Sequence, residues 1–134
     1  MQSLSVHLGP RSYPICIGSG LIARPELFES HVRARSVLVV TNEVVAPLYL
    51  DRLRGALKGR RGAELVLPDG ERHKNLATLE KVFDALVQAR LHRDDAILAL
   101  GGGVIGDIAG FAAACYQRGI AYAQVPTTLL AQVD

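Results

Sequence analysis

The chain has 134 residues, 49% of them hydrophobic, and a formal net charge of +2. This length suits one domain with a hydrophobic core and is too short for two, and the charges form no basic stripe of the kind that binds nucleic acid. No apolar run approaches the roughly 18 residues of a membrane span, and Met1 is not followed by a secretory signal pattern. The two cysteines, Cys16 and Cys115, stand in apolar surroundings without metal or redox spacing. We therefore expect a cytoplasmic protein with both cysteines in its core and with neither nucleic-acid nor membrane partners.

The first residues predict a β-hairpin followed by a short helix. Apolar residues alternate with polar ones at Leu4, Val6, Leu8, Tyr13, Ile15 and Ile17. A period of two, interrupted by turn residues at 9–12, is typical of two strands that share one buried face. Residues 21–28 then have the composition of a short helix.

From residue 36 onward, strand patterns alternate with helix patterns. Strands are expected at 37–40, 63–67, 96–100 and 120–125, and helices at 44–58, 76–89, 104–116 and from 129. In the second of these helices, Asn75 is the expected N-cap and the expected apolar face is Leu76, Leu79, Phe83, Leu86 and Val87. The third is apolar nearly all round, which predicts a buried helix, and residues 58–61 look like a solvated helix end. The alternation predicts an α/β fold with a doubly wound, mostly parallel, Rossmann-like sheet, preceded by the hairpin, in a single domain over residues 1–134.

A glycine-rich turn separates the strand expected at 96–100 from the next helix. Glycine has no Cβ to keep the backbone away from a ligand, so successive N–H groups can face an anion at the start of that helix. The spacing Gly101-x-Gly103-x-x-Gly106 matches the dinucleotide fingerprint, but the acid expected at the end of the following strand is missing. Asp107 stands beside the glycines instead. It either interacts with the helix dipole or contacts neutral hydroxyl or amide groups of a ligand.

Polar clusters follow all four expected strands. They are Thr41–Glu43, Asp69–Lys74, Gly101–Asp107 and Thr127–Thr128. Because the carboxyl ends of parallel strands lie at one edge of a sheet, all four should meet there. Each has an ordinary alternative explanation, since Asp-Gly is a common turn pair and Thr after Pro a common helix cap. Their joint placement favours a nucleotide site.

Three motifs make this chain resemble the 3-dehydroquinate synthase family. They are Leu67-Pro68-Asp69-Gly70-Glu71-x-x-Lys74, the glycine turn through Asp107, and Gln117-Arg118-Gly119 followed by the segment from Gln124 to Asp134. The resemblance covers essentially the whole chain. The last motif is specific to that family, whereas the glycine motif also occurs in the related iron-dependent alcohol and glycerol dehydrogenases. The chain resembles the N-terminal, NAD-binding domain of the family.

The resemblance implies an enzyme of the shikimate pathway, a phosphate-eliminating carbon–oxygen lyase. It converts the small phosphate substrate 3-deoxy-D-arabino-heptulosonate 7-phosphate into 3-dehydroquinate and phosphate, with NAD and a divalent zinc or cobalt ion as cofactors and as a homodimer. In the family the metal ligands lie in a C-terminal helical domain, which is absent here, and His7, His31, His73 and His92 have no metal-ligand spacing. We expect this chain alone to bind NAD and not to catalyse the reaction.

The resemblance also assigns cofactor-binding residues, motif by motif. Asp69, Gly70, Glu71, Arg72, His73 and Lys74 would form the loop at the adenosine end, and Gly102, Gly103, Val104, Ile105, Gly106 and Asp107 would hold the pyrophosphate and adjoining ribose. Thr127 and Thr128 would add polar contacts, with Asn42 as a further candidate. His73 replaces an aromatic residue that is common in the family. Without the resemblance, Glu71 and Lys74 are better explained as a solvated loop pair.

Arg118 and Asp134 are the candidates for contact with substrate. In the family the arginine reaches the substrate phosphate across a dimer interface, although a cation in the last turn of a helix is an equal explanation. Asp134 matches an acid that binds substrate hydroxyls. Two other functions stay open, a stand-alone nucleotide-binding module and a domain of an iron-dependent alcohol or glycerol dehydrogenase. The motif Gln124–Thr128 argues against the dehydrogenase.

Overall fold

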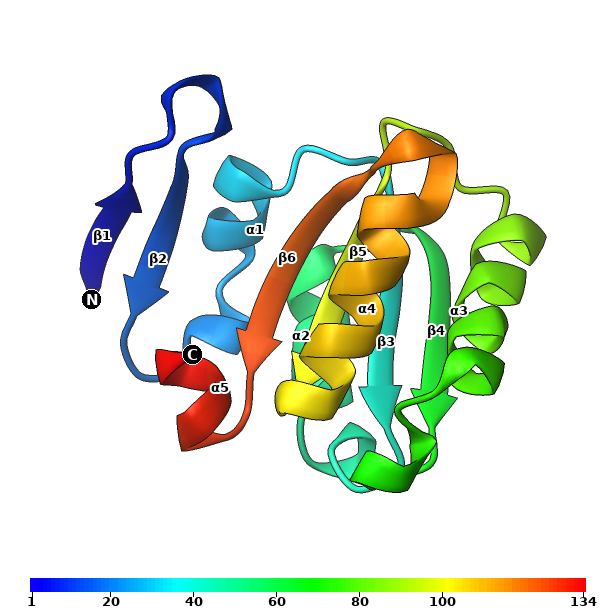
Figure 1. The fold of residues 1–134 in the computed structure, drawn as a ribbon. Helices are drawn as coiled ribbons and strands as arrows, with labels where there is room; N and C mark the ends of the chain where they lie inside the picture. The colour runs from blue at the N-terminus through cyan, green and yellow to red at the C-terminus, as the bar shows by residue number, and fades with distance from the viewer.

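The computed structural model describes residues 1–134 and contains a parallel sheet with helices on both faces (Figure 1). The sheet strands are β3 (Ser36–Asn42), β4 (Arg61–Leu67), β5 (Ala96–Gly101) and β6 (Ala121–Pro126). Their order is β4-β3-β5-β6, and every neighbouring pair is parallel. The predicted α/β fold with a doubly wound sheet is confirmed.

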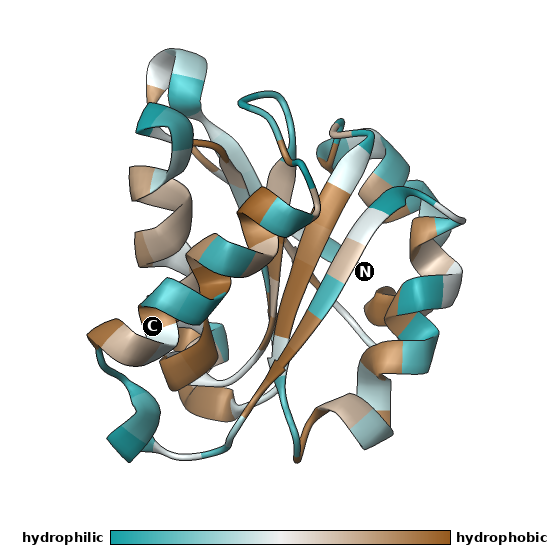
Figure 2. Cartoon of the chain, turned by 90° about the vertical axis from the view of Figure 1, so that its right-hand side faces the viewer, coloured by the Kyte–Doolittle hydropathy of each residue, from teal (hydrophilic) through white to brown (hydrophobic).

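Two helix layers cover the sheet. They consist of α1 (Pro25–His31) and α2 (Ala46–Leu57) on one face and α3 (Leu76–Gln88) and α4 (Gly103–Cys115) on the other. Successive residues of β3 divide between the two cores, because Leu38 packs with α3 and α4 whereas Val39 packs with α1 and α2. Every residue of β5 is buried, which explains its continuous apolar run. Figure 2 shows the apolar strands of the sheet between the two helix layers.

The predicted hairpin forms, but its apolar face is exposed. β1 (Gln2–Val6) and β2 (Tyr13–Ile17) pair antiparallel, with Leu4 opposite Ile15. They make a separate two-stranded sheet, in which Leu4 is 57% exposed and Tyr13 51%. The expectation of a buried face is wrong for this chain. Alternation determines which side chains share a face and leaves open what covers that face.

The helix expected at residues 21–28 is divided in two. A 3-10 turn occupies Leu21–Ala23, and α1 begins at Pro25, a residue that is favoured in the first helical turn because it lacks an N–H group. Arg60, expected at a solvated helix end, is partly buried. Its guanidinium donates hydrogen bonds to the carbonyl groups of Phe28, Val32 and Ala34, so it satisfies the backbone between α1 and β3.

The N-cap of α3 is the one predicted, and of the expected apolar face Leu79, Phe83 and Leu86 pack against the core. The Oδ1 atom of Asn75 accepts the N–H of Thr78 at 2.9 Å. Leu76 and Val87 are exposed, and the buried residues of α3 are Thr78, Val82 and Leu86. Leu76 and Val87, which the sequence pattern placed on the apolar face, lie near the two ends of α3 and face away from the sheet.

Helix α4 is buried on one face only. Its buried residues are Ile105, Ile108, Ala109, Ala112 and Ala113, whereas Phe111 is 59% exposed. Cys115 in the last turn is exposed and Cys16 is half-buried, so the expectation of two core cysteines is wrong. Apolar composition does not show which side of a helix meets the sheet. None of the helices combines the length and apolar character needed to cross a membrane.

Gly62 is a sharp test of the β3–β4 pairing. Its φ is +146°, and an added Cβ would lie 1.8 Å from the carbonyl oxygen of Val37. We expect Gly62→Ala to lower the free energy of unfolding by about 3 kcal/mol in a urea titration, because the strands must separate and the backbone is strained.

The matched control is Gly55→Ala in α2, where an added Cβ meets nothing within 4 Å. The free energy of unfolding of that variant should rise by about 0.5–1 kcal/mol, since alanine is the better helix former. A Gly62→Ala variant as stable as the parent would contradict the observed register.

Candidate functional site

The loops that follow the parallel strands meet at the carboxyl edge of the sheet, as predicted. Asn42, at the end of β3, donates from Nδ2 to Oδ1 of Asp69 at 3.1 Å, which joins the loops after β3 and β4. Lys74 donates from Nζ to Oδ2 of Asp107 at 2.6 Å, which joins the β4 loop to α4. The chain moves outward from β3 in both directions, to β4 and to β5, and ligands of such sheets bind at this switch point.

Asn42 organises the loop after β3. Its side chain is buried, and Oδ1 accepts the N–H groups of Val44 at 3.0 Å and Val45 at 2.8 Å. The backbone N–H of Asp69 donates to Oε1 of Glu43 at 3.2 Å. Asp69 is therefore held by two residues of the neighbouring loop, and its second carboxylate oxygen is available to a ligand. Glu43 was expected at this edge within the cluster Thr41–Glu43, but it was not among the predicted cofactor-binding residues.

The glycine turn leaves the start of α4 uncapped. Gly102 is the N-cap residue and supplies no side-chain hydrogen bond, so the first N–H groups of α4 have no side-chain partner. Such groups, with the helix dipole, favour a bound anion. A Cβ on Gly103 would meet no atom within 4 Å, whereas a Cβ on Gly102 would lie 3.0 Å from Thr128. A side chain at Gly102 would therefore crowd Thr128, whereas Gly103 faces open space.

The two threonines after β6 differ in what they do. The backbone N–H of Thr127 donates to the carbonyl of Gly101 at 3.0 Å, which fixes the β6 loop against the glycine turn. The Oγ1 of Thr128 accepts the N–H of Ala131 at 3.2 Å and caps α5 (Leu129–Val133). For Thr128 the alternative explanation, an ordinary helix cap, is thus observed.

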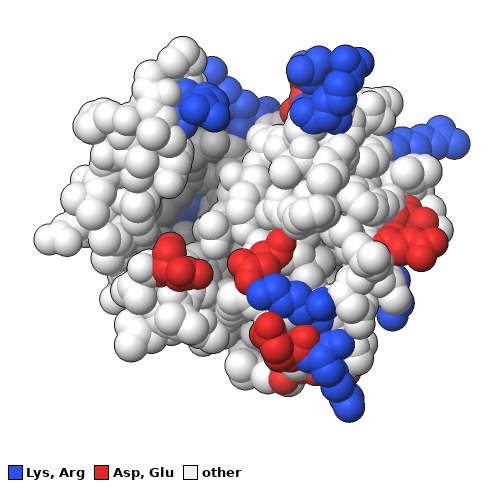
Figure 3. Space-filling model, in the orientation of Figure 1, with Lys and Arg blue, Asp and Glu red and all other residues white.

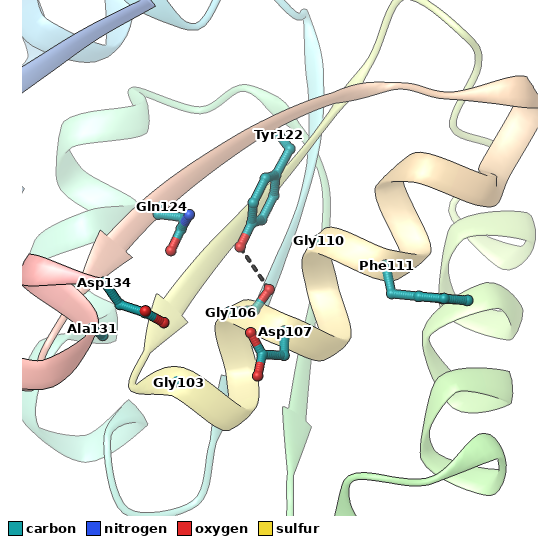
Figure 4. Close-up of a pocket in the computed structure, with 9 residues that line it drawn as sticks. All are labelled: Gly103, Gly106, Asp107, Gly110, Phe111, Tyr122, Gln124, Ala131 and Asp134. Carbon is teal, nitrogen blue, oxygen red and sulfur yellow. Dashed lines mark hydrogen bonds between the residues drawn. The ribbon is translucent and has the colours of Figure 1, made fainter. Parts of the chain in front are cut away.

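A cavity of about 370 Å³ lies between β6, α4 and α5 (Figure 4). Its lining residues are Gly103, Gly106, Asp107, Gly110, Phe111, Tyr122, Gln124, Ala131 and Asp134. Figure 4 shows Gln124 and Asp134 projecting toward this space from β6 and from the end of the chain. Polar groups from three elements therefore border one cavity beside the glycine turn.

Tyr122 connects β6 to α4 under this cavity. Its hydroxyl donates to the carbonyl oxygen of Gly106 at 2.6 Å, and a Cβ on Gly110 would lie 3.2 Å from its ring. Burial, and next the negative charge of Asp107, raise the pKa of Tyr122 to about 12, so the hydroxyl keeps its proton at neutral pH. The sequence reasoning missed Tyr122 and Gln124. Two features of the sequence could have identified them. Tyr122 and Gln124 are polar side chains on one face of a strand, and the helix before this strand has glycines four residues apart.

Lys74 lies between two carboxylates. Its Nζ is 2.6 Å from Asp107 and 3.6 Å from Oε1 of Glu71, and the hydrogen bond to Asp107 raises the pKa of Lys74 above its usual value. Arg72 donates from Nε to Nε2 of its neighbour His73 at 3.2 Å. Figure 3 shows acidic and basic side chains next to one another along the lower edge of the molecule. The edge thus carries charges of both signs.

Arg118 does not join this edge. It lies in the 3-10 turn Tyr116–Arg118, which connects the far end of α4 to the start of β6. Gln117 and Arg118 have φ values of 50° and 62°, which lie in the left-handed helical region, and Gly119 after them has φ 115° and ψ 125°. The Arg118 of this chain is remote from its own candidate site, and a role across a subunit interface stays a prediction.

Comparison with known sequences shows one family. The sequence model of the 3-dehydroquinate synthase N-terminal domain matches residues 64–134. The 3-dehydroquinate synthases of Methylococcus capsulatus and Nitrosococcus oceani are 61% and 60% identical to this chain over 134 residues, which is 100% of this chain and 37% of each relative. The chain spans just over a third of the length of these curated relatives.

Solved structures share the fold. A 2-deoxy-scyllo-inosose synthase complexed with carbaglucose-6-phosphate, NAD+ and Co2+ matches with a TM-score of 0.85 and 25% identity, over 97% of this chain and 36% of that chain. ValA, a 2-epi-5-epi-valiolone synthase from Streptomyces hygroscopicus with NAD+ and Zn2+ bound, matches with a TM-score of 0.73 and 32% identity, over 92% and 35%. Together with the family match over more than half of the sequence, these likenesses show that the chain belongs to the 3-dehydroquinate synthase family.

Proposed function

We propose that residues 1–134 form the NAD-binding domain of a 3-dehydroquinate synthase. The whole enzyme would convert 3-deoxy-D-arabino-heptulosonate 7-phosphate into 3-dehydroquinate and phosphate, as a cytoplasmic homodimer. The observation that supports this most is the meeting of four loops at the uncapped start of α4, in a chain 61% identical to a 3-dehydroquinate synthase. The chain covers 37% of that relative, and the reaction is therefore proposed for a longer protein in which these residues are one domain.

The residues present fit a dinucleotide. The N–H groups at the start of α4, with the open space at Gly103, suit a pyrophosphate. Asp69, held by Asn42 and Glu43, has a free oxygen for the ribose hydroxyls of the adenosine end, and Asp107 would accept from a hydroxyl of the adjoining ribose. When bound, NAD supplies the reversible oxidation of a substrate hydroxyl. The residues of this chain would bind the NAD and orient it.

We further propose that the metal is held by residues outside this chain. No group of three His, Cys, Asp or Glu side chains that could hold a metal ion gathers in the structure. Asp134 and Gln124, which border the cavity, are the candidates for contact with substrate hydroxyls. Arg118, at the opposite edge of the sheet, would serve the site of a partner subunit.

The chain should bind NAD+ in preference to NADP+. Glu43, Asp69 and Glu71 stand where the adenosine end would lie, and their charges would repel a 2′-phosphate. We expect NADP+ to bind at least about tenfold more weakly in calorimetric titrations. Asp69→Asn should reduce the difference in affinity between NAD+ and NADP+. Equal or tighter binding of NADP+ by the parent chain would contradict the charge argument.

A side chain at Gly103 should block the dinucleotide without harming the fold. An added Cβ there meets no atom within 4 Å outside its own helix backbone and chain neighbours, so we expect Gly103→Val to keep the fold while placing a bulky group where the pyrophosphate would lie. We expect NAD+ affinity to fall by at least about a hundredfold. Gly103→Ala should show a smaller loss, and thermal unfolding of both variants should match the parent. Normal NAD+ binding by Gly103→Val would show that the ligand does not approach this turn.

The chain alone should not turn over substrate. The cavity between β6, α4 and α5 is open to solvent on one side, and α5 exposes Leu129, Leu130 and Val133. We expect no phosphate release from the heptulosonate phosphate with NAD+ and zinc or cobalt, because elimination and ring closure need a metal and a shielded cavity. The complete Methylococcus capsulatus relative serves as the positive control. Release by the isolated chain would contradict the division of roles proposed here.

A further inference from the structure

Asp107 places a carboxylate beside the backbone groups that would hold a pyrophosphate. It is the fifth residue of α4, and it borders the same cavity as Gly103. Two like charges about 6 Å apart, at an effective dielectric constant of about 40, weaken binding by roughly tenfold. An anion site with an uncompensated carboxylate at this position would therefore lose much of the benefit of the helix N-terminus.

The structure supplies a compensating charge from another loop. Lys74, in the connection between β4 and α3, places Nζ 2.6 Å from Oδ2 of Asp107. The lysine side chain is 41% exposed and the aspartate 56%, and pairs as exposed as this one contribute little to stability. The short contact is thus better explained by the neutralisation of the Asp107 charge at the start of α4.

We propose that Lys74 is the counterion of Asp107 and that it cancels the carboxylate charge, so that an anionic pyrophosphate can bind at the start of α4. The inference rests on the proposed function, because it assigns the ion pair to the pyrophosphate end of the dinucleotide site. Asp107 keeps its other oxygen, Oδ1, to accept a hydrogen bond from a ligand hydroxyl. Lys74 is then a positioning residue that acts through Asp107.

Two further features agree with this assignment. The hydrogen bond to Asp107 raises the pKa of Lys74, so the ammonium group stays charged throughout the neutral range. The second carboxylate near Lys74, that of Glu71, is more distant at 3.6 Å and belongs to the same loop. The contact with Asp107 is the one that brings the Lys74 ammonium group to α4.

A double-mutant cycle with inorganic pyrophosphate tests the proposal. The probe is titrated into the ¹⁵N-labelled chain while the amide signals of Gly103, Val104 and Ile105 are followed by NMR. We expect Lys74→Met to weaken pyrophosphate binding by about tenfold. Adding Asp107→Asn to it should restore affinity to within about threefold of the parent, because no carboxylate is left to neutralise.

Two control variants accompany the cycle. Lys58→Met removes the same charge at the opposite edge of the sheet, where the lysine lies 3.6 Å from Glu29, and should change affinity less than about twofold. Lys74→Arg keeps the charge and should bind like the parent. The amide spectra of all variants report directly whether the fold is retained.

Three results would overturn the counterion assignment. They are an equal loss from Lys74→Met with and without Asp107→Asn, no loss from Lys74→Met, and no pyrophosphate-induced shift at the start of α4 in the parent. Titration of the same samples with NAD+ separates this proposal from the proposed function. A parent chain that shows the pyrophosphate coupling but does not bind NAD+ contradicts the dinucleotide function alone.

Discussion

The pairing of β5 with both β3 and β6 is the constraint on which the rest of the structure depends. Every residue of β5 is buried, and its parallel register sets Ala99 beside Val40 and Gly101 beside Pro126. Parallel strands end at the same edge, so this register brings the glycine turn next to the loops of its neighbours. The meeting of these loops at one edge is therefore a consequence of backbone pairing in the apolar centre of the sheet.

Helix α4 is fixed against that sheet by a close contact that Gly110 permits. Gly110 makes room for the ring of Tyr122, whose hydroxyl donates to the carbonyl of Gly106. A glycine inside a helix costs about 1 kcal/mol relative to alanine, and here the packing of a large aromatic ring offsets it. The contact sets the position of the start of α4 relative to β6, where the cavity lies.

Polar residues of the candidate site have two different roles in the structure: some shape the loops, and others present free carboxylate oxygens. Asn42 and Thr128 shape the loops through backbone hydrogen bonds. Asp69 and Asp107 present carboxylates that are held on one side and free on the other. The same residue types in a sequence suit either task, because caps and ligand contacts both need short side chains with oxygen acceptors.

The sequence by itself determined the α/β class, the order of strands and helices, the N-cap Asn75 and the gathering of four polar loops at one edge, because these follow from local periodicity and from the direction of parallel strands. Only the tertiary structure decided that the hairpin face is exposed, that Arg60 is bonded inward and that Lys74 reaches Asp107. Those outcomes depend on which surfaces meet across the chain, and a pattern along one segment holds no information about a partner far away in sequence.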